Sequence, residues 1–277
     1  MKKQSSCPER AGKKWFLLAM SALCIAPASV CRAAESSADL KVTVEAWVAN
    51  NSEYTEDAVP RTAIGPHGEL STNFYKLSLE KGFGNVYLVG SLNLGSIQEQ
   101  RMYLDYAETD HVEIDGNIIG GEISGYYRVG DPSRYLDFGA GYLFSHTTKE
   151  FYDHTVSGVP DPERQGNFGR FKMDHQILSA KIRGRVTKGD FGLEGRASYG
   201  KAWNETTVEG WPGGTTREET DGYDYSLELA ALWMPMPELE VKAGYRHERL
   251  YFDPPSAGSH DLDVRYNGPF FSAGWLL

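Results

Sequence analysis

Hydrophobic and polar residues alternate along most of this chain, from Leu40 to the C-terminal Leu277. Alternation with a period of two is typical of β-strands, whose successive side chains point to opposite faces. Ten segments show the pattern, separated by polar or turn-forming residues. They cover residues 40–50, 72–82, 85–96, 113–129, 134–148, 172–187, 190–204, 222–234, 238–251 and 263–277. The pattern therefore predicts an all-β chain of about ten strands.

The two faces of each predicted strand differ in chemistry. One face of segment 222–234 carries, in order, Tyr225, Leu227, Leu229, Ala231 and Trp233. A continuous apolar face of this kind suits contact with lipid. The alternation slips between Asn117 and Ile119 and again at Gly268-Pro269, and we interpret both places as β-bulges or strand ends.

The connections between the segments also alternate. Four are tight turns, built on Gly82-Phe83-Gly84-Asn85, Gly130-Asp131-Pro132-Ser133, Lys188-Gly189-Asp190 and Pro235-Met236-Pro237. The other five are longer, roughly ten to twenty-five residues, as is usual for the extracellular loops of membrane barrels. We therefore expect one domain, residues 34–277, folded as a closed antiparallel transmembrane β-barrel.

The other face of the segments is charged and nearly balanced. Its basic members are Lys41, Lys76, Arg128, Lys181, Arg183, Arg185, Arg196, Lys242 and Arg246, and its acidic members are Glu45, Glu80, Glu122, Asp137, Glu194, Glu228, Glu240 and Glu248. A soluble β-sandwich or lipocalin-like barrel would also alternate, but this charged face would then have to face water while the apolar face formed the core. In a membrane barrel the charged face lines the lumen, where burial requires pairing. We expect an internal network of salt bridges.

The first 33 residues have the layout of a secretory signal peptide. Basic residues precede an apolar run from Trp15 to about Val30, which ends in small residues, and cleavage after Ala33 is expected. A lipoprotein signal is the alternative, since Ala28-Ser29-Val30 precedes Cys31. We expect export through the periplasm and residence in the cell outer membrane of a Gram-negative bacterium.

Removal of this segment changes the composition of the chain. Cys7, Cys24 and Cys31, the three cysteines, all lie in it, so the mature chain would have no disulfide. Six basic residues and one acidic residue would also be lost, which moves the formal net charge from −10 to about −15. Nucleic acid is therefore not an expected partner.

The last ten residues, Gly268-Pro-Phe-Phe-Ser-Ala-Gly-Trp-Leu-Leu277, resemble the final-strand signal of bacterial outer-membrane proteins. The resemblance implies recognition by the barrel assembly machinery through this strand. The chain departs from the signal by ending in Leu where Phe is usual.

Ten strands over roughly 240 residues also resemble, in layout, the omptin family of outer-membrane proteases. That resemblance implies a water held by an aspartate pair on one side of the rim and an Asp-His pair on the other. The predicted loop 96–112 offers Asp105, Asp110 and His111, while loop 205–221 contains no histidine. The protease motif is therefore not reproduced.

Further candidate residues lie near the predicted outer loops. Asp153 and His154 form another Asp-His neighbour pair, and the seven histidines are interpreted as solvated loop residues without a metal site. Lys172, Lys201 and Arg249 keep lipid-facing parity near the outer ends of their strands. They are candidate contacts for lipopolysaccharide phosphates, or simply cations that reach the membrane surface.

These observations leave three classes of function open. We favour a non-enzymatic surface barrel, structural or binding, whose long acidic outer loops contact an extracellular ligand, with outer-membrane lipid as a partner and no cofactor. A narrow passive channel is the second class. An omptin-like rim protease or another outer-membrane hydrolase is the third. Loop residues decide such functions, and spacing alone does not reveal a catalytic triad.

Overall fold

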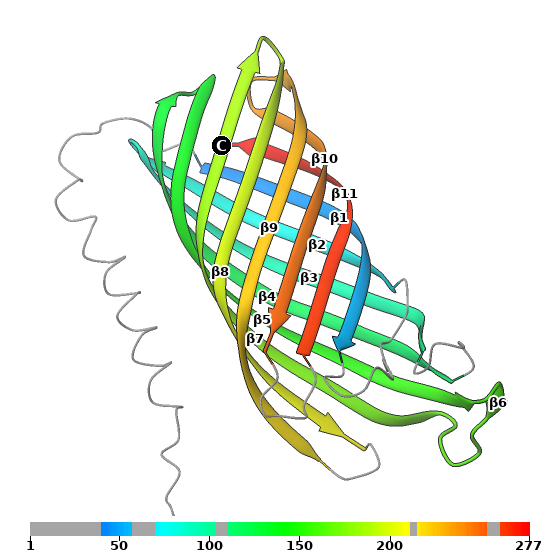
Figure 1. Ribbon diagram of the computed structural model, residues 1–277. Coiled ribbons are helices and arrows are strands. Elements are labelled where there is room, and N and C mark those ends of the chain that lie inside the picture. The colour runs from blue at the N-terminus through cyan, green and yellow to red at the C-terminus, as the bar shows by residue number, and fades with distance from the viewer. Residues whose placement is uncertain (1–39, 57–69, 104–109, 211–214, 254–260) are drawn as a thin grey trace, which may run out of the picture. The chain divides into compact units, whose positions relative to one another are not determined.

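The computed structural model describes residues 40–56, 70–103, 110–210, 215–253 and 261–277, and almost all of them are in β-strands. Figure 1 shows long, strongly tilted strands in one sheet. The strands are β1 (Leu40–Glu56), β2 (Leu70–Phe83), β3 (Val86–Tyr103), β4 (His111–Asp131), β5 (Arg134–Val156), β6 (Val159–Pro160), β7 (Asn167–Lys188), β8 (Phe191–Glu209), β9 (Thr216–Met236), β10 (Leu239–Phe252) and β11 (Asp261–Leu276).

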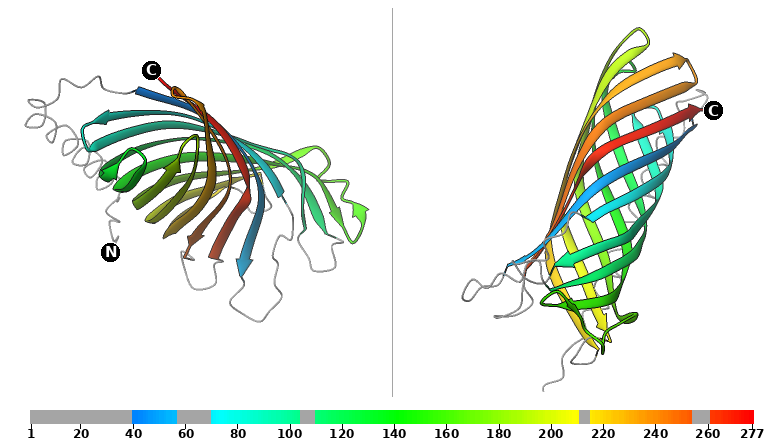
Figure 2. Two further views of the ribbon diagram at one scale, coloured as in Figure 1. Left: turned by 90° about the horizontal axis from the view of Figure 1, so that it is seen from above. Right: turned by 90° about the vertical axis from the view of Figure 1, so that its right-hand side faces the viewer.

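The sheet closes into a barrel of ten long antiparallel strands. Consecutive long strands pair with each other, β1 pairs with β11, and β4 pairs with β5, so the ring has no open edge. The two-residue β6 pairs only with the end of β5 and extends that hairpin beyond the ring. The two views in Figure 2 show the strands curving around a common axis. Closure satisfies the backbone hydrogen bonds of every long strand, as a lipid environment requires.

The four tight turns predicted from the sequence are present in the structure, between β2 and β3, β4 and β5, β7 and β8, and β9 and β10. Gly84 and Gly189 adopt positive φ angles of 63° and 60° between their strands, a conformation that glycine reaches without steric cost. In the β4–β5 turn, Asp131 Oδ1 accepts hydrogen bonds from the amides of Ser133 and Arg134, at 2.8 and 2.9 Å. These turns lie at one end of the barrel, opposite the longer connections. We call it the inner end and the other the outer end, after the short inner turns and long outer loops that are usual in outer-membrane barrels.

The strands extend further at the outer end than the alternation predicted. β5 continues to Val156 rather than residue 148, and β9 begins at Thr216 rather than residue 222. Residues 205–209 and 216–221, predicted as part of a loop, are therefore strand. In residues 205–209 and 216–221 most side chains on both faces are polar, so these strand ends show little hydrophobic contrast although their backbones remain paired.

Both predicted slips in alternation were wrong. The β3–β4 and β4–β5 registers run without interruption through Asn117, Ile118 and Ile119. The β10–β11 register is likewise continuous through Gly268 and Pro269. Ile118 points into the barrel and Ile119 points outward, so an apolar lumen residue beside an apolar lipid-facing residue gave the appearance of a slip. Register shifts occur elsewhere, for example between Ile97 and Gln100.

The outer face carries a band of exposed apolar side chains. Leu229, Phe138, Leu178, Tyr245 and Phe271 are each half or more exposed, and they come from five different strands. No helix in the described part of the chain is long and apolar enough to cross a membrane. An apolar exterior around a polar lumen is the arrangement of outer-membrane barrels, and the chain is a closed antiparallel transmembrane β-barrel of this type.

Candidate functional site

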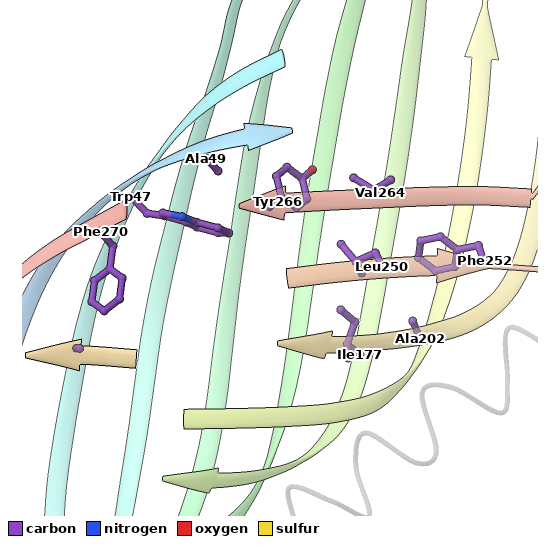
Figure 3. Close-up of a cluster of buried hydrophobic side chains, with 10 residues drawn as sticks. Trp47, Ala49, Ile177, Ala202, Leu250, Phe252, Val264, Tyr266 and Phe270 are labelled. Carbon is purple, nitrogen blue, oxygen red and sulfur yellow. The ribbon is translucent and has the colours of Figure 1, made fainter. Parts of the chain in front are cut away.

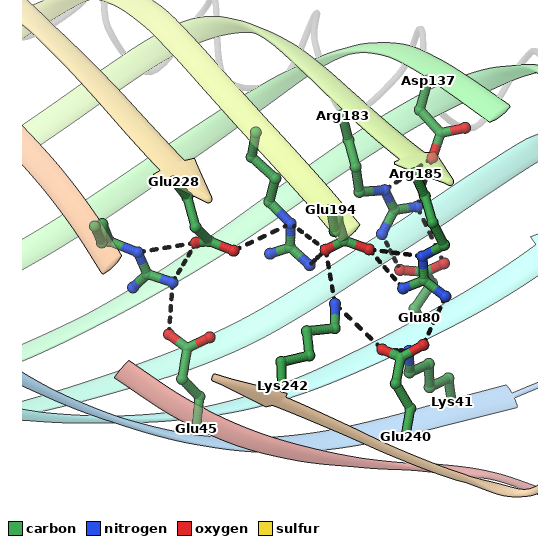
Figure 4. A network of polar contacts seen from close by, with 12 residues as sticks. Lys41, Glu45, Glu80, Asp137, Arg183, Arg185, Glu194, Glu228, Glu240 and Lys242 are labelled. Atoms are coloured by element: carbon green, nitrogen blue, oxygen red, sulfur yellow. Dashed lines mark hydrogen bonds and ion pairs between the residues drawn. The ribbon is translucent and has the colours of Figure 1, made fainter. Parts of the chain in front are cut away.

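The inner half of the lumen is filled by ion pairs. Glu194, whose side chain is fully buried, contacts Arg185 Nη2 at 2.5 Å, Arg196 Nη2 at 2.7 Å and Lys242 Nζ at 2.7 Å. Glu240 in turn contacts Arg185 at 2.6 Å. Figure 4 shows how these side chains, from strands on different sides of the barrel, meet near its axis.

Further pairs extend this network, which we call the ionic layer. Asp137, also fully buried, contacts Arg128 at 2.8 Å and Arg183 at 2.7 Å. Arg246 contacts Glu228 at 2.6 Å and Glu45 at 2.7 Å. The remaining pairs are Lys41 and Lys242 with Glu240, Lys76 and Lys181 with Glu122, Arg183 with Glu80, and Arg196 with Glu228. The sequence prediction of a charged, internally paired lumen face is confirmed.

The outer half of the lumen contains a cluster of apolar side chains among its polar ones, which the sequence analysis did not predict. Trp47, Ile177, Leu250, Phe252 and Tyr266 point inward and are buried together. Figure 3 shows these side chains projecting from strands on both sides of the interior. The full set, which we call the apolar layer, also contains Ala49, Ala202, Ala230, Val264 and Phe270, with Phe74 and Leu143 packed against it.

Aromatic contacts tie the apolar layer together. Trp47 stacks on Phe74 with ring centroids 4.9 Å apart, and Phe74 meets Tyr266 edge to face at 5.3 Å. The indole N–H of Trp47 donates to the carbonyl of Gly268 at 3.2 Å. A second buried cluster of Ile97, Val112, Ile114, Ile118 and Phe151 packs against the same Phe74. The expectation that paired charges alone fill the lumen is therefore corrected.

A cavity of about 220 Å³ lies in the lumen and is lined by residues of both layers. Asp224 and Glu248 contribute carboxylates to its wall. Asp224 is 6% exposed, and its Oδ1 has no hydrogen-bond partner among the described residues. Asp224 was omitted from the predicted inward set, as was Lys149, which is buried on the inward alternation of β5.

Four of the five predicted rim residues, Asp110, His111, Asp153 and His154, lie close together in the fold. The fifth, Asp105, lies outside the described residues. Strand pairing sets His111 opposite Thr155, next to His154 and Asp153. Asp110 Oδ1 accepts the amide of Ser157 at 2.5 Å. Asp153 Oδ1 accepts the amide of Gly166 at 2.7 Å. Both carboxylates thus hold turns of the backbone, and their role in catalysis stays a prediction.

His154 belongs to the hairpin that β5 forms with β6. Its Nδ1 lies 3.1 Å from Asp161 Oδ2, and the side chain is almost fully buried. Asp161 also accepts the amide of Glu163 at 3.0 Å. That amide, and then the ring of His154, hold the pKa of Asp161 below its ordinary value of 3.8. We call this arrangement the outer latch.

The interpretation of the histidines as solvated loop residues was wrong for two of them. His154 is buried in the outer latch, and His175 is buried in the lumen, where it stacks on Phe252 at 5.3 Å. Sequence position near a loop did not reveal either environment. Among the described residues, no group of three or more His, Cys, Asp or Glu side chains is placed to hold a metal ion.

The three candidate lipopolysaccharide contacts all have acidic neighbours. Lys172 Nζ lies 2.7 Å from Glu209, Lys201 Nζ lies 3.0 Å from Asp221, and Arg249 Nε lies 2.8 Å from Asp263. Beside them, the rings of Tyr199, Tyr223 and Tyr251 stack across β8, β9 and β10 at 6.2 and 5.1 Å. Tyrosines at this level are typical of the interface between lipid and water.

A chain of polar side chains on the outward face was missed by the sequence analysis. His146 Nδ1 lies 2.7 Å from Asp174 Oδ1, and Thr148 Oγ1 lies 3.1 Å from His146 Nε2. His146 and Asp174 are directly opposite each other on β5 and β7. Their separation in sequence hides the contact, which only the strand register brings about.

The structure resembles several solved outer-membrane barrels at low similarity. The translocator domain of autotransporter NalP from Neisseria meningitidis is 12% identical, with a TM-score of 0.43, covering 95% of this chain and 97% of that chain. Ail, the attachment invasion locus protein of Yersinia pestis, in complex with the heparin analogue sucrose octasulfate, is 10% identical, with a TM-score of 0.36 and coverages of 87% and 100%. The Pseudomonas putida toluene transporter TodX is 10% identical, with a TM-score of 0.34 and coverages of 85% and 68%. No family model matches the chain, and no curated protein matches it.

Proposed function

We propose that this barrel acts at the surface of the outer membrane and that its lumen is not an open diffusion path. The observation that carries the proposal is the stacking of two different layers in one narrow lumen. The apolar layer narrows the outer half, and the ionic layer occupies the inner half with paired side chains. A ten-stranded barrel is only slightly wider than the eight-stranded barrels whose side chains fill the interior.

The ionic layer supports this proposal because its members are held in place. Glu194 and Asp137 are each shared by two or more cations and have fully buried side chains. Moving any one of these groups aside leaves a charge without its partner in a poorly solvated interior, which is costly. Thermal motion of single side chains therefore does not open a continuous aqueous path.

Single-channel recording in planar bilayers tests the proposal. The native barrel is expected to give no stable open level. A variant that thins only the apolar layer, Trp47→Ala with Phe252→Ala, is expected to stay closed because the ionic layer remains. Adding Arg183→Ala and Arg185→Ala should produce current steps, provided that gel mobility before and after heating shows a folded barrel. Stable open levels of the native protein would favour the narrow channel instead.

We also infer that residues 1–33 direct export and are then removed. These residues lie outside the described part of the chain, and the inference rests on their order of basic, apolar and small residues. Intact mass of the protein purified from outer membranes is expected to match a chain beginning at Ala34. A lipid-modified chain beginning at Cys31 would establish the lipoprotein alternative.

Outer-leaflet lipid is the partner that we propose for Lys172, Lys201 and Arg249. Arg249 lies 2.8 Å from Asp263, a carboxylate that it shares with Arg265 at 2.6 Å. Such a cluster suits a lipid phosphate. Arg249→Gln is expected to weaken co-purification of lipopolysaccharide more than Lys201→Gln does, since Lys201 has a single acid of its own. Equal retention by both variants would contradict this assignment.

The C-terminal strand is the segment that we propose for recognition by the barrel assembly machinery. Phe271 and Trp275 point outward from β11 and are half-exposed to lipid. Phe271→Asp is expected to lower the amount of folded barrel in membranes without changing synthesis. Unchanged assembly of that variant would exclude this strand face as the signal.

A further inference from the structure

The polar chain of Asp174, His146 and Thr148 has the connectivity of a catalytic triad. A carboxylate that accepts a hydrogen bond from Nδ1–H fixes the imidazole in the tautomer whose Nε2 is a free acceptor. The Asp174 oxygen lies 2.7 Å from Nδ1, and the Thr148 hydroxyl lies 3.1 Å from Nε2. The hydroxyl therefore donates to the nitrogen that can remove its proton. Such triads are recognised by this geometry and recur on unrelated folds.

The three side chains lie at the outer edge of the lipid band. Below them on β5, the outward positions 136 to 144 are Leu, Phe, Ala, Tyr and Phe. Ten residues separate Leu136 from His146, which corresponds to about 25 Å along the membrane normal at roughly 3.3 Å per residue and a tilt near 40°. An outer-membrane apolar band is about 25 Å tall. His146 is thus placed where headgroups meet acyl chains.

Water and lipid can both reach this position. The side chains of His146 and Asp174 are 47% and 58% exposed. A pair this exposed contributes little to folding, because water already solvates both groups. Stability alone therefore gives little reason for three connected polar groups directly above an apolar row.

We propose that Thr148, His146 and Asp174 hydrolyse acyl esters of outer-leaflet lipids. The ester linkages of such lipids lie at the boundary between headgroup and acyl chain, which is the level of the triad. The shared chemistry is a carboxylic ester of a long-chain fatty acid, present in phospholipids and in lipopolysaccharide. Threonine hydroxyls serve as nucleophiles when an adjacent base activates them.

The reaction consists of two balanced acyl transfers. Thr148 Oγ1 attacks the ester carbonyl while His146 Nε2 takes the hydroxyl proton, and the leaving alcohol then receives that proton as the ester bond breaks. Water next attacks the acyl-threonine, again losing a proton to Nε2, and releases the fatty acid with the hydroxyl of Thr148 restored. Asp174 stabilises the imidazolium in both steps. No cofactor or oxidant is required.

Donors for the tetrahedral oxyanion flank the nucleophile. Thr148 pairs across the sheet with Asn117 on β4 and with Lys172 on β7. The Asn117 amide can donate to an oxyanion, and the Lys172 ammonium adds positive charge at the same level when it leaves Glu209, which lies 2.7 Å away. Lys172 is also one of the proposed lipid-phosphate contacts, so the same side chain can orient an anionic headgroup beside the triad.

This inference does not depend on the closed lumen, because the triad lies on the opposite face of the sheet. The test uses the purified mature barrel in two kinds of vesicle, one of phosphatidylethanolamine with phosphatidylglycerol and one that also contains lipopolysaccharide. Mass spectrometry follows released fatty acid and, after acid quenching, an acyl adduct on the peptide that contains Thr148.

Four variants distinguish catalysis from structure. Thr148→Val and His146→Ala are expected to lower fatty-acid release by at least about a thousandfold, and Asp174→Asn by about a hundredfold or more. Thr148→Ser should retain activity because it keeps the hydroxyl. The matched control is Tyr142→Phe, which removes a 2.8 Å hydrogen bond to Gln176 between the same two strands and should leave the rate unchanged.

The two vesicles identify the substrate. Release of phospholipid acyl chains only, or of lipopolysaccharide acyl chains only, would support the proposal and name the lipid. Absence of release from both vesicles by folded native protein would overturn it, as would a Thr148→Val variant that is as active as the native chain. Failure here would leave the electrical test of the lumen unaffected.

Discussion

Ion pairs inside the barrel and ion pairs on its outer face have similar distances but different surroundings. Lys242 and Glu194 lie 2.7 Å apart in the lumen, with side chains 5% and 0% exposed. Lys201 and Asp221 lie 3.0 Å apart on the outward face, with side chains 48% and 60% exposed. A lost partner leaves an uncompensated buried charge in the first case, whereas water or a lipid headgroup replaces it in the second.

This difference separates structural from reactive groups in the molecule. Lumen charges are buried and paired, and Glu194, Glu240 and Asp137 are each shared by two or more cations. Outward charges near the outer ends of the strands can exchange partners with lipid and water. The pair of His146 and Asp174 belongs to the second class, which is why its chemistry is available to a substrate.

The largest effect is expected from Glu194→Gln. Three cations contact this carboxylate, and the substitution leaves them facing a neutral amide in the interior. The free energy of unfolding is expected to fall by about 3–5 kcal/mol. Urea titration in lipid vesicles, followed by tryptophan fluorescence, measures the change.

The matched outward substitution is Glu205→Gln, which breaks the exposed pair with Arg217 at 2.6 Å. Its expected cost is below about 1 kcal/mol. If the two substitutions destabilised the barrel equally, burial would not be what distinguishes the two classes of ion pair.

A smaller loss of stability is expected from a substitution within the apolar layer. Ile177→Ala removes a buried side chain from the lumen and leaves a cavity, at a cost of about 2–5 kcal/mol. The neighbouring Leu178 points to lipid and is 51% exposed. Leu178→Ala should cost less, because acyl chains fill the space that the side chain vacates. A larger loss for Leu178 than for Ile177 would reverse the assignment of the two faces.

The smallest expected effect is a pH-dependent change in the mobility of the outer hairpin around Asp161. Because the pKa of Asp161 is lowered in the folded hairpin, its stabilising contribution is present above its ordinary value of 3.8 and is lost as pH falls through the lower folded value. A spin label on Glu163→Cys should become more mobile below about pH 4. Asp161→Asn should abolish this pH dependence, since an amide does not titrate. A label whose mobility is constant from pH 5 to pH 2 would show that the outer latch does not depend on this carboxylate.

The barrel and its charged lumen face could be predicted from sequence because lipid imposes a strict alternation on every strand. The apolar layer could not, since Ile118 beside Ile119, or Phe270 beside Phe271, is indistinguishable by pattern from a slipped strand. Asp224 looked like one more polar residue on the correct face, and only its neighbours show that it lacks a hydrogen-bond partner at Oδ1.

The outward triad was hidden for a different reason. His146 and Asp174 are 28 residues apart in the chain. They meet because the antiparallel register of β5 and β7 sets them directly opposite each other. A one-residue change of register would send one of them into the lumen. Spacing in the sequence does not specify register, so the contact emerges only from the folded sheet.

The closed lumen is tested most directly by thiol labelling, because all three cysteines lie in residues 1–33 and residues 34–277 contain none. Ser179→Cys places a thiol in the wall of the lumen cavity, and Glu163→Cys places one on the exposed outer hairpin. A membrane-impermeant maleimide added outside is expected to modify residue 163 fully while residue 179 stays unmodified, until Trp47→Ala and Phe252→Ala remove the apolar layer. Rapid modification of residue 179 in the otherwise native barrel would show that water crosses that layer and would contradict the account.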